Sequence, residues 1–401
     1  MRKNILLLLF INIIFSCKSQ NYKIVFEDVD DSRLAVGAAR TQGYFPALKG
    51  RTVALCINHT STIGDTHLLD TLLSAGVKVT KIFSPEHGFR GNEEAGKHIS
   101  GSVDSKTGVS IVSLYGKNKK PTKEQMQGID IVVFDMQDVG ARFYTYISTL
   151  HYIMEAAAEN NVKVIVLDRP NPNGFWVDGP VLDTALRSFI GMHPVPIVHG
   201  MTIGEYAKMI NGEGWLEGRI KCDLTVVPVF GYAHMFRYQL EKNPSPNLSS
   251  MAAIYLYPSL CLFEGTPMSI GRGTDTPFCL LGHPDFPIGD VYFTPQNIPG
   301  IATNPPCLGQ KCHGFDLTNL SLVVMKNGNF INIDLLIEAY ENYPDKTKFF
   351  TSFFDKLAGT KNLKQQIIAG KTTVQIKESW QQDLEKFKQI RKKYLLYPDF
   401  E

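Results

Sequence analysis

Apolar runs alternate with helical patterns between residues 52 and 167, and this alternation limits the chain to a small set of folds. Four short runs rich in Val, Ile and Leu occupy residues 52–57, 77–83, 129–134 and 162–167. Residues 67–75 and 145–160, which lie between such runs, have apolar side chains at helical spacing. A β, α, β order of this kind predicts an α/β fold with a parallel sheet covered by helices.

The second half of the chain has a different pattern. Beyond about Leu224 the alternation weakens, and prolines and glycines become dense through Gly309. We therefore expect a second structural region there. Near the end, apolar residues recur at three- and four-residue steps from Ile376 to Tyr394, which predicts one long amphipathic helix packed on the body of the protein.

The first seventeen residues have the layout of a bacterial lipoprotein signal. Arg2 and Lys3 precede an apolar run over residues 5–15, and Ser16 stands directly before Cys17. The run is shorter than the ~20 residues that a membrane-spanning helix requires. We predict a signal peptide over residues 1–17, lipid on Cys17, and a polar tether over residues 18–32. The protein is then exported and anchored to a membrane, with the periplasm as the expected compartment.

The charge balance narrows the choice of partner. The chain has 41 basic and 39 acidic residues and a net charge of +2, so no strong field favours nucleic acid.

Cys307 and Cys312 are the only closely spaced cysteines, and their spacing suits either a disulfide or two free thiols. No second Cys/His pair accompanies them, so a zinc site there is the weaker interpretation.

Polar residues follow each predicted strand, and in an open parallel sheet such loops meet at one edge. Glu86, His87 and Arg90 follow the second strand. The loops after the third and fourth strands carry further candidates, namely Asp135, Gln137, Asp138, Arg142, Asp168, Arg169 and Asn171. Glu86 is the strongest acid/base candidate, with an ordinary ion pair to Arg90 as its alternative. Asp135 and Asp138 could act in catalysis or cap a helix.

Arginines on this rim suit an anionic ligand. Arg142 and Arg169 could each bind a carboxylate through two hydrogen bonds, or could instead orient the nearby aspartates. A glycine-rich loop over residues 263–274 adds Glu264 and Arg272, and we expect it to form the other half of a site.

Other chemistries find less support in the sequence. No Gly-x-Gly-x-x-Gly follows the first strand, and no phosphate-binding loop, His-Glu-x-x-His helix or Gly-x-Ser-x-Gly turn occurs. We therefore expect no cofactor and no metal. A metal-dependent hydrolase using His87, Asp135 and His199 remains an alternative.

Long ordered stretches resemble the exo-β-N-acetylmuramidase family of glycoside hydrolases. They span residues 48–51, 58–60, 84–91, 135–146, 168–172, 199–205, 244–247, 264–274 and 391–397. The resemblance implies a Rossmann-like domain over residues 33–250 and a smaller α+β domain over residues 251–401, with the active-site cleft between them. It also implies release of N-acetylmuramic acid from the non-reducing ends of peptidoglycan glycans. Pro267-Met268 and residues 282–285 depart from the family pattern.

The resemblance also implies roles for single residues. Glu86 matches the catalytic glutamate, and the second carboxylate is expected to be Glu264, with Asp135 in reserve. Muramic acid carries a lactyl carboxylate, so an arginine should contact it. The expected substrate-binding residues are Asn58, His87, Arg90, Gln137, Asp138, Arg142, Tyr144, Tyr146, Arg169, Asn171, His199 and Arg272.

Some alternatives remain open at this point. A non-catalytic lipoprotein that binds cell-wall fragments would use the same arginines and aromatic rings. The sequence alone leaves open the oligomeric state, the stereochemical outcome and the acceptance of peptide-bearing muramic acid.

Overall fold

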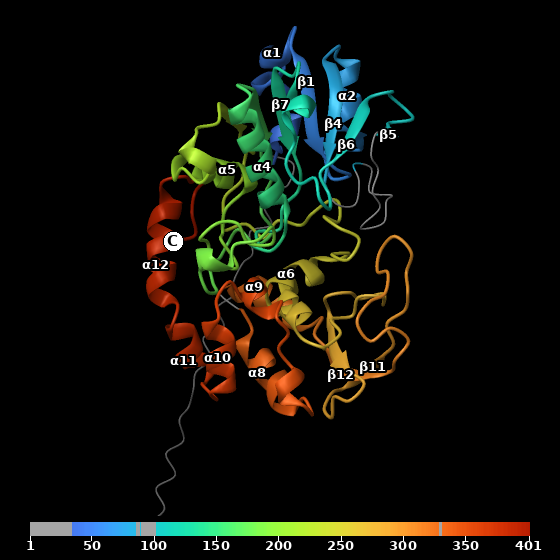
Figure 1. The fold of residues 1–401 in the computed structure, drawn as a ribbon, viewed down its shortest axis with the longest axis vertical. Helices are drawn as coiled ribbons and strands as arrows, with labels where there is room; N and C mark the ends of the chain where they lie inside the picture. The colour runs from blue at the N-terminus through green and yellow to red at the C-terminus, as the bar shows by residue number, and fades with distance from the viewer. Residues whose placement is uncertain (1–33, 86–88, 90–101, 329–330) are drawn as a thin grey trace, which may run out of the picture. The chain divides into compact units, whose positions relative to one another are not determined.

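A seven-stranded, mostly parallel sheet forms the centre of the computed structural model, which describes residues 34–85, 89, 102–328 and 331–401. The strand order is β5-β6-β4-β1-β7-β8-β9, and only β5 runs antiparallel to its neighbour. The strands are β1 (Thr52–Ile57), β4 (Lys78–Ser84), β5 (Ser102–Val103), β6 (Ser110–Ser113), β7 (Ile131–Asp135), β8 (Lys163–Leu167) and β9 (Leu224–Val227). This confirms the predicted α/β fold (Figure 1).

Both faces of this sheet are buried, which explains the continuous apolar runs. Val53, Leu55 and Ile57 face one core with α2 (Leu68–Ser74), whereas Ala54 and Cys56 face the other core with α4 (Tyr146–Glu159) and α5 (Ile203–Gly212). Successive side chains of a strand point to opposite faces, so a strand covered on both sides must be apolar throughout. The predicted strands and the two predicted helices agree with these elements to within two residues.

The second half combines helices with a small antiparallel sheet. That sheet has the order β10-β12-β11, formed by β10 (Leu280–His283), β11 (Val291–Phe293) and β12 (Cys312–Asp316). The remaining helices are α1 (Phe45–Leu48), α3 (Lys123–Met126), α6 (Met251–Leu260), α7 (Leu320–Asn327), α8 (Ile333–Asn342), α9 (Phe354–Ala358), α10 (Asn362–Ile368), α11 (Thr373–Glu378) and α12 (Gln381–Lys392). The expectation of a second, α+β region is confirmed.

The predicted long C-terminal helix is two helices, α11 and α12. The break lies at Trp380, which has a non-helical backbone, while its indole Nε1 donates to Asp178 Oδ1 at 3.2 Å. Trp380 and the apolar residues on both sides, Ile376 and Leu384, are still buried. Apolar spacing predicted the buried side chains correctly. It did not predict the helix break, because the apolar pattern continues across Trp380.

The last residues return to the central sheet. In Figure 1 the upper end of α12 (red) lies near α5, and the Tyr394 hydroxyl donates to Glu213 at 2.6 Å. Arg391 is fully buried, donates to the Gly200 carbonyl and pairs with Asp399. The C-terminal stretch that resembles the family therefore holds the chain end against the sheet.

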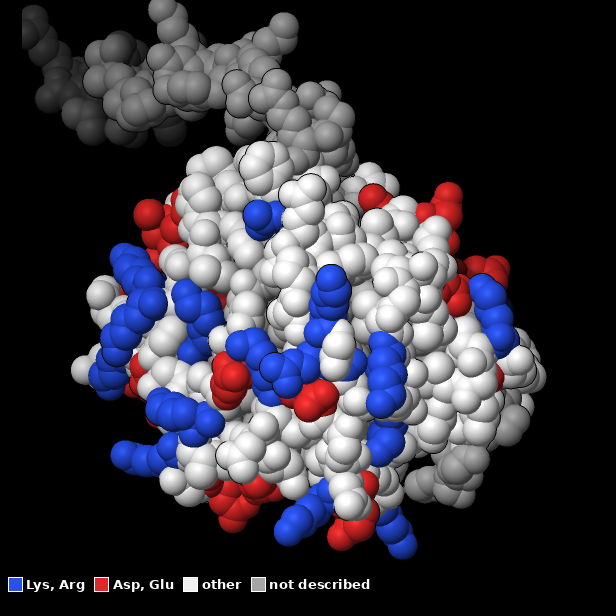
Figure 2. All heavy atoms as spheres, turned by 90° about the horizontal axis from the view of Figure 1, so that it is seen from above, with Lys and Arg blue, Asp and Glu red and all other residues white. Residues whose placement is uncertain are grey.

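Two surface properties bear on the partner. Among the residues that the structure describes, no helix combines the length and the apolar composition needed to cross a bilayer. On the face drawn in Figure 2, lysine and arginine side chains are interspersed with aspartate and glutamate. Such mixing matches the nearly balanced charge of the sequence.

Candidate active site

The carboxyl ends of β1, β7 and β8 bring three of the predicted loops to one rim. The chain order reverses at β1, which lies between β4 and β7, and such a switch point is where open α/β sheets bind ligands. Glu86, His87 and Arg90 follow β4, the other neighbour of β1, but they lie outside the described residues, as does Cys17. Their expected roles stay predictions.

Asn58 organises the loop after β1. Its side-chain oxygen accepts hydrogen bonds from the backbone N–H and the hydroxyl of Thr60, and its Nδ2 donates to the Tyr146 hydroxyl at 2.8 Å. Asn58 has no exposed surface, so in this structure it positions Tyr146 rather than touching a ligand itself.

Asp135 forms a buried ion pair with Arg169. Arg169 Nε lies 2.5 Å from Asp135 Oδ1 and Nη2 lies 2.9 Å from Oδ2, and Nη2 also donates to the Thr62 carbonyl at 3.1 Å. Because both carboxylate oxygens are occupied by one guanidinium, Asp135 is not free to serve as the second catalytic carboxylate or as a metal ligand here. The geometry favours the alternative in which Arg169 orients an aspartate.

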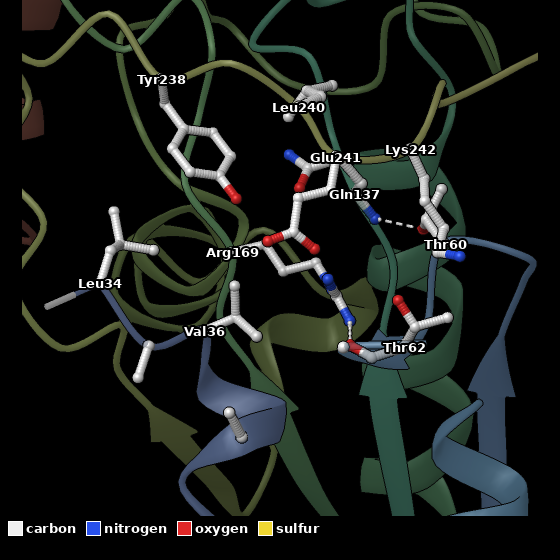
Figure 3. A pocket seen from close by; sticks show the side chains of 13 residues that line it. Leu34, Val36, Thr60, Thr62, Gln137, Arg169, Tyr238, Leu240, Glu241 and Lys242 are labelled. Carbon is white, nitrogen blue, oxygen red and sulfur yellow. Dashed lines mark hydrogen bonds between the residues drawn. The ribbon is translucent and has the colours of Figure 1, made fainter. Parts of the chain in front are cut away.

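Arg169 also lines a polar pocket of about 160 Å³, which we call the Arg169 pocket (Figure 3). Thr60 and Thr62 after β1 and Gln137 after β7 form part of its wall. The opposite wall comes from Tyr238, Leu240, Glu241 and Lys242. Figure 3 shows the Glu241 carboxylate directed toward the Arg169 guanidinium.

Asp168 anchors a helix and the chain end. It accepts hydrogen bonds from the Thr202 hydroxyl at 2.7 Å, the Gly204 N–H at 2.8 Å and the Tyr397 hydroxyl at 2.5 Å. A Cβ on Gly204 would lie only 2.6 Å from Asp168 Cγ, so this position requires glycine. The stretch at residues 199–205 is therefore the start of α5, where Thr202 and Glu205 form a capping box.

Asp138 and His199 are a buried polar pair. Asp138 Oδ2 accepts from the Gly140 N–H at 2.7 Å and lies 3.9 Å from His199 Nε2. Among the described residues, neither Asp138 Oδ1 nor His199 Nε2 has a hydrogen-bond partner. Burial raises the pKa of Asp138 to about 7 and lowers the pKa of His199 to about 3. Neither residue lines either of the two pockets described in this section.

Gln137, Asn171 and Arg142 bind backbone carbonyls. Gln137 Nε2 donates to Asp138 and Pro170, and Asn171 Nδ2 donates to Met201. Arg142 is fully buried and donates to four carbonyls, those of Pro180, Val195, Leu357 and Ala358. In this structure the Arg142 guanidinium therefore links the central sheet region to α9 and has no surface exposed to a ligand.

Glu264 and Arg272 meet in a second pocket, of about 200 Å³, which we call the Glu264 pocket. Arg272 Nη1 donates to Glu264 Oε1 at 2.8 Å, and both side chains are partly exposed. The other lining residues are Phe143, Tyr144, Thr145, Tyr146, Ile190, Ser245, Asn247, Leu248, Tyr257 and Phe278. The structure thus brings together four predicted residues from distant parts of the sequence: Tyr144, Tyr146, Glu264 and Arg272.

The aromatic wall of this pocket is fixed in place. The Tyr144 and Tyr146 rings contact edge to face with centroids 4.8 Å apart, and the Tyr144 hydroxyl donates to the Pro244 carbonyl at 2.8 Å. Tyr257 contacts both Tyr144 and Phe278 in the same manner. Sequence reasoning did not assign Tyr257, because α6 is apolar on all sides and gives no periodic sign of which side chain faces a pocket.

Comparison with known proteins identifies the family. The N-terminal and C-terminal models of the exo-β-N-acetylmuramidase NamZ match residues 53–252 and 255–397. The peptidoglycan β-N-acetylmuramidase NamZ of Bacillus subtilis is 38% identical over 377 residues, which cover 88% of this chain and 89% of that protein. This chain belongs to the exo-β-N-acetylmuramidase family. The expected family and a glycoside hydrolase activity are thereby confirmed.

Two solved crystal structures have the same fold as this chain. Both are crystal structures of DUF1343 family proteins from Bacteroides fragilis, with 50% identity and a TM-score of 0.85 for one and 30% identity and a TM-score of 0.74 for the other. Each comparison covers 91% of this chain and 99% of the solved chain. The likeness extends through both halves of the protein.

Proposed function

We propose that the protein releases N-acetylmuramic acid from the non-reducing ends of peptidoglycan fragments, with the sugar bound in the Glu264 pocket. The observation that carries this proposal is the Glu264–Arg272 pair inside an aromatic-lined pocket. Family membership supports the reaction, and the pocket chemistry supports the substrate.

The pocket suits a sugar that bears a carboxylate. Aromatic rings provide apolar surface for a pyranose face, and a guanidinium provides five N–H donors. Arg272 uses Nη1 for Glu264, so its other donors are suited to the lactyl carboxylate. A cation between Glu264 and the substrate anion would also offset the repulsion between the two carboxylates.

In the mechanism we propose, Glu86 donates a proton to the departing glycosidic oxygen while Glu264 stabilises the positive charge that develops on the sugar ring. Asp135 has no part in these steps, because its carboxylate is held by Arg169. Asn58 acts indirectly by holding the Tyr146 hydroxyl.

The test uses the purified full chain with two substrates. Glu86→Gln should lose at least about 100-fold in kcat on a muramic acid–glucosamine disaccharide. It should lose less on an aryl β-N-acetylmuramide, whose leaving group needs little protonation. Glu341→Gln changes an exposed glutamate of α8, and this control should retain full activity. Near-normal cleavage of the disaccharide by Glu86→Gln would refute the assignment of Glu86.

Exo action and anchoring need their own measurements. A glycan with muramic acid at its non-reducing end should lose single N-acetylmuramic acid units, identified by mass, whereas larger released fragments would contradict exo action.

We further propose that lipid on Cys17 tethers the enzyme at the cell envelope. Cys17→Ala should then move the protein from the membrane fraction to the soluble fraction.

A further inference from the structure

Cys307 and Cys312 face each other beside the Glu264 pocket. Both thiols are free in this structure, and they interact closely enough that each shifts the pKa of the other. Cys312 begins β12, pairs with Phe293 of β11 and is fully buried, whereas Cys307 is partly exposed. A partly exposed thiol that interacts with a buried one five residues later is an arrangement from which a disulfide can form.

The turn between the two cysteines holds this geometry. Cys307 has a φ of +60°, which a residue with a side chain adopts rarely. The Gln310 N–H donates to the Cys307 carbonyl at 3.0 Å, and the Gly309 N–H donates to the Pro295 carbonyl at 2.8 Å. The backbone thus adopts an unfavourable conformation at Cys307, within the turn that precedes Cys312.

The loop that ends at this turn supports the pocket at three points. The Gln296 N–H donates to the Gly273 carbonyl at 2.8 Å, directly after Arg272. Asn247, which lines the Glu264 pocket, donates from Nδ2 to the Ile301 carbonyl at 2.8 Å. Cys307 Sγ lies 3.8 Å from the Pro267 carbonyl, three residues beyond Glu264. A cross-link at Cys307 would therefore stiffen the loop beneath both charged residues of the pocket.

We propose that Cys307 and Cys312 form a reversible disulfide that braces the Glu264 pocket. With a small-molecule disulfide as oxidant, the Cys307 thiolate attacks one of its sulfur atoms and releases one thiol. The Cys312 thiolate then attacks Cys307 Sγ in the mixed disulfide and releases the second thiol. The protons of the two cysteines end on the two released thiols, so atoms and electrons balance.

The electrostatics agree with this order of attack. The hydrogen bond from Cys312 lowers the pKa of the Cys307 thiol, and the same contact raises the pKa of Cys312. Burial raises the pKa of Cys222 to about 12 and raises the pKa of Cys56 above its usual range. Among the described cysteines, Cys307 is therefore the one suited to start the exchange.

Peptide mapping tests the proposal, because Lys311 lies between the two cysteines. The full chain is treated with oxidised glutathione, alkylated and digested with trypsin, which cuts after Lys311. We expect two peptides joined by a disulfide that dithiothreitol separates. Cys312→Ser should instead trap glutathione on Cys307, and Cys307→Ser should give no linked pair. Complete alkylation of both cysteines in the oxidised wild type would overturn the proposal.

Thermal unfolding tests the brace. Oxidation should raise the unfolding midpoint of the wild type by roughly 3 °C, given the short loop that the bond closes and the size of the chain. The Cys307→Ser/Cys312→Ser double variant should match the reduced wild type and should not respond to oxidant. An equal shift in that variant would refute the brace. Neither measurement needs a substrate, so its failure is distinct from failure of the proposed hydrolase function.

Discussion

Two carboxylate–arginine pairs in this protein each contribute to the wall of a pocket, and they differ in burial and geometry. In the Asp135–Arg169 pair the side chains are 0% and 8% exposed, and one guanidinium holds both carboxylate oxygens. In the Glu264–Arg272 pair they are 26% and 33% exposed, joined by one hydrogen bond. The first pair therefore leaves no carboxylate oxygen of Asp135 without a partner, although Arg169 itself lines a pocket. The second keeps unused donors and acceptors facing a pocket, which is what a binding site requires.

The largest expected effect is on stability and comes from breaking the buried pair. Asp135→Asn leaves the Arg169 charge buried beside a neutral partner, and we expect it to lower the free energy of unfolding by about 3–5 kcal/mol. Glu264→Gln breaks the partly exposed pair and should cost no more than about 1 kcal/mol. Urea denaturation of both variants checks this. Similar losses in the two variants would mean that the burial difference between the pairs does not matter.

A smaller effect concerns specificity. Arg272→Lys keeps the charge but loses the planar, forked donor geometry. We expect the preference for an aryl β-N-acetylmuramide over the matching β-N-acetylglucosaminide, measured as a ratio of kcat/KM, to fall about tenfold, or about 1.4 kcal/mol. The two substrates differ only in the lactyl ether.

Arg169→Lys is the matched control, assayed at a temperature where it is folded. It alters the arginine of the other pair and should leave the substrate preference unchanged. If Arg169→Lys lowered the preference and Arg272→Lys did not, the lactyl carboxylate would belong in the Arg169 pocket.

The sequence predicted where strands and loops lie along the chain better than it predicted what surrounds each side chain. The central strands and the meeting of their loops follow from apolar runs and from the geometry of parallel sheets. Arg142 and Arg272 were both expected to reach the substrate, yet one is enclosed by four carbonyls and the other lines a pocket. The four carbonyls around Arg142 belong to residues 180, 195, 357 and 358. No local sequence pattern reveals partners that far away. The same holds for Trp380, whose partner Asp178 lies 202 residues earlier in the chain.

The smallest expected effect involves Asp138, a buried carboxyl that the structure gives no arginine partner among the described residues. Its pKa is about 7 in the folded protein against an ordinary value of 3.8. Between these values the folded state holds a proton that the unfolded chain has lost. The stability from Asp138 is therefore full below about pH 4 and is lost as the pH rises through 7.

His199 has the opposite dependence, because its pKa falls to about 3 from an ordinary 6.5. Its contribution is full above about pH 6.5 and is lost as the pH falls toward 3. Asp138→Asn removes only the first dependence and retains an oxygen for the Gly140 N–H. Relative to wild type, the variant should therefore gain about 1 kcal/mol of unfolding free energy between pH 6 and pH 7. Parallel pH profiles for the two proteins would show that Asp138 is ionised when folded. The lack of an arginine partner would then not set Asp138 apart from Asp135.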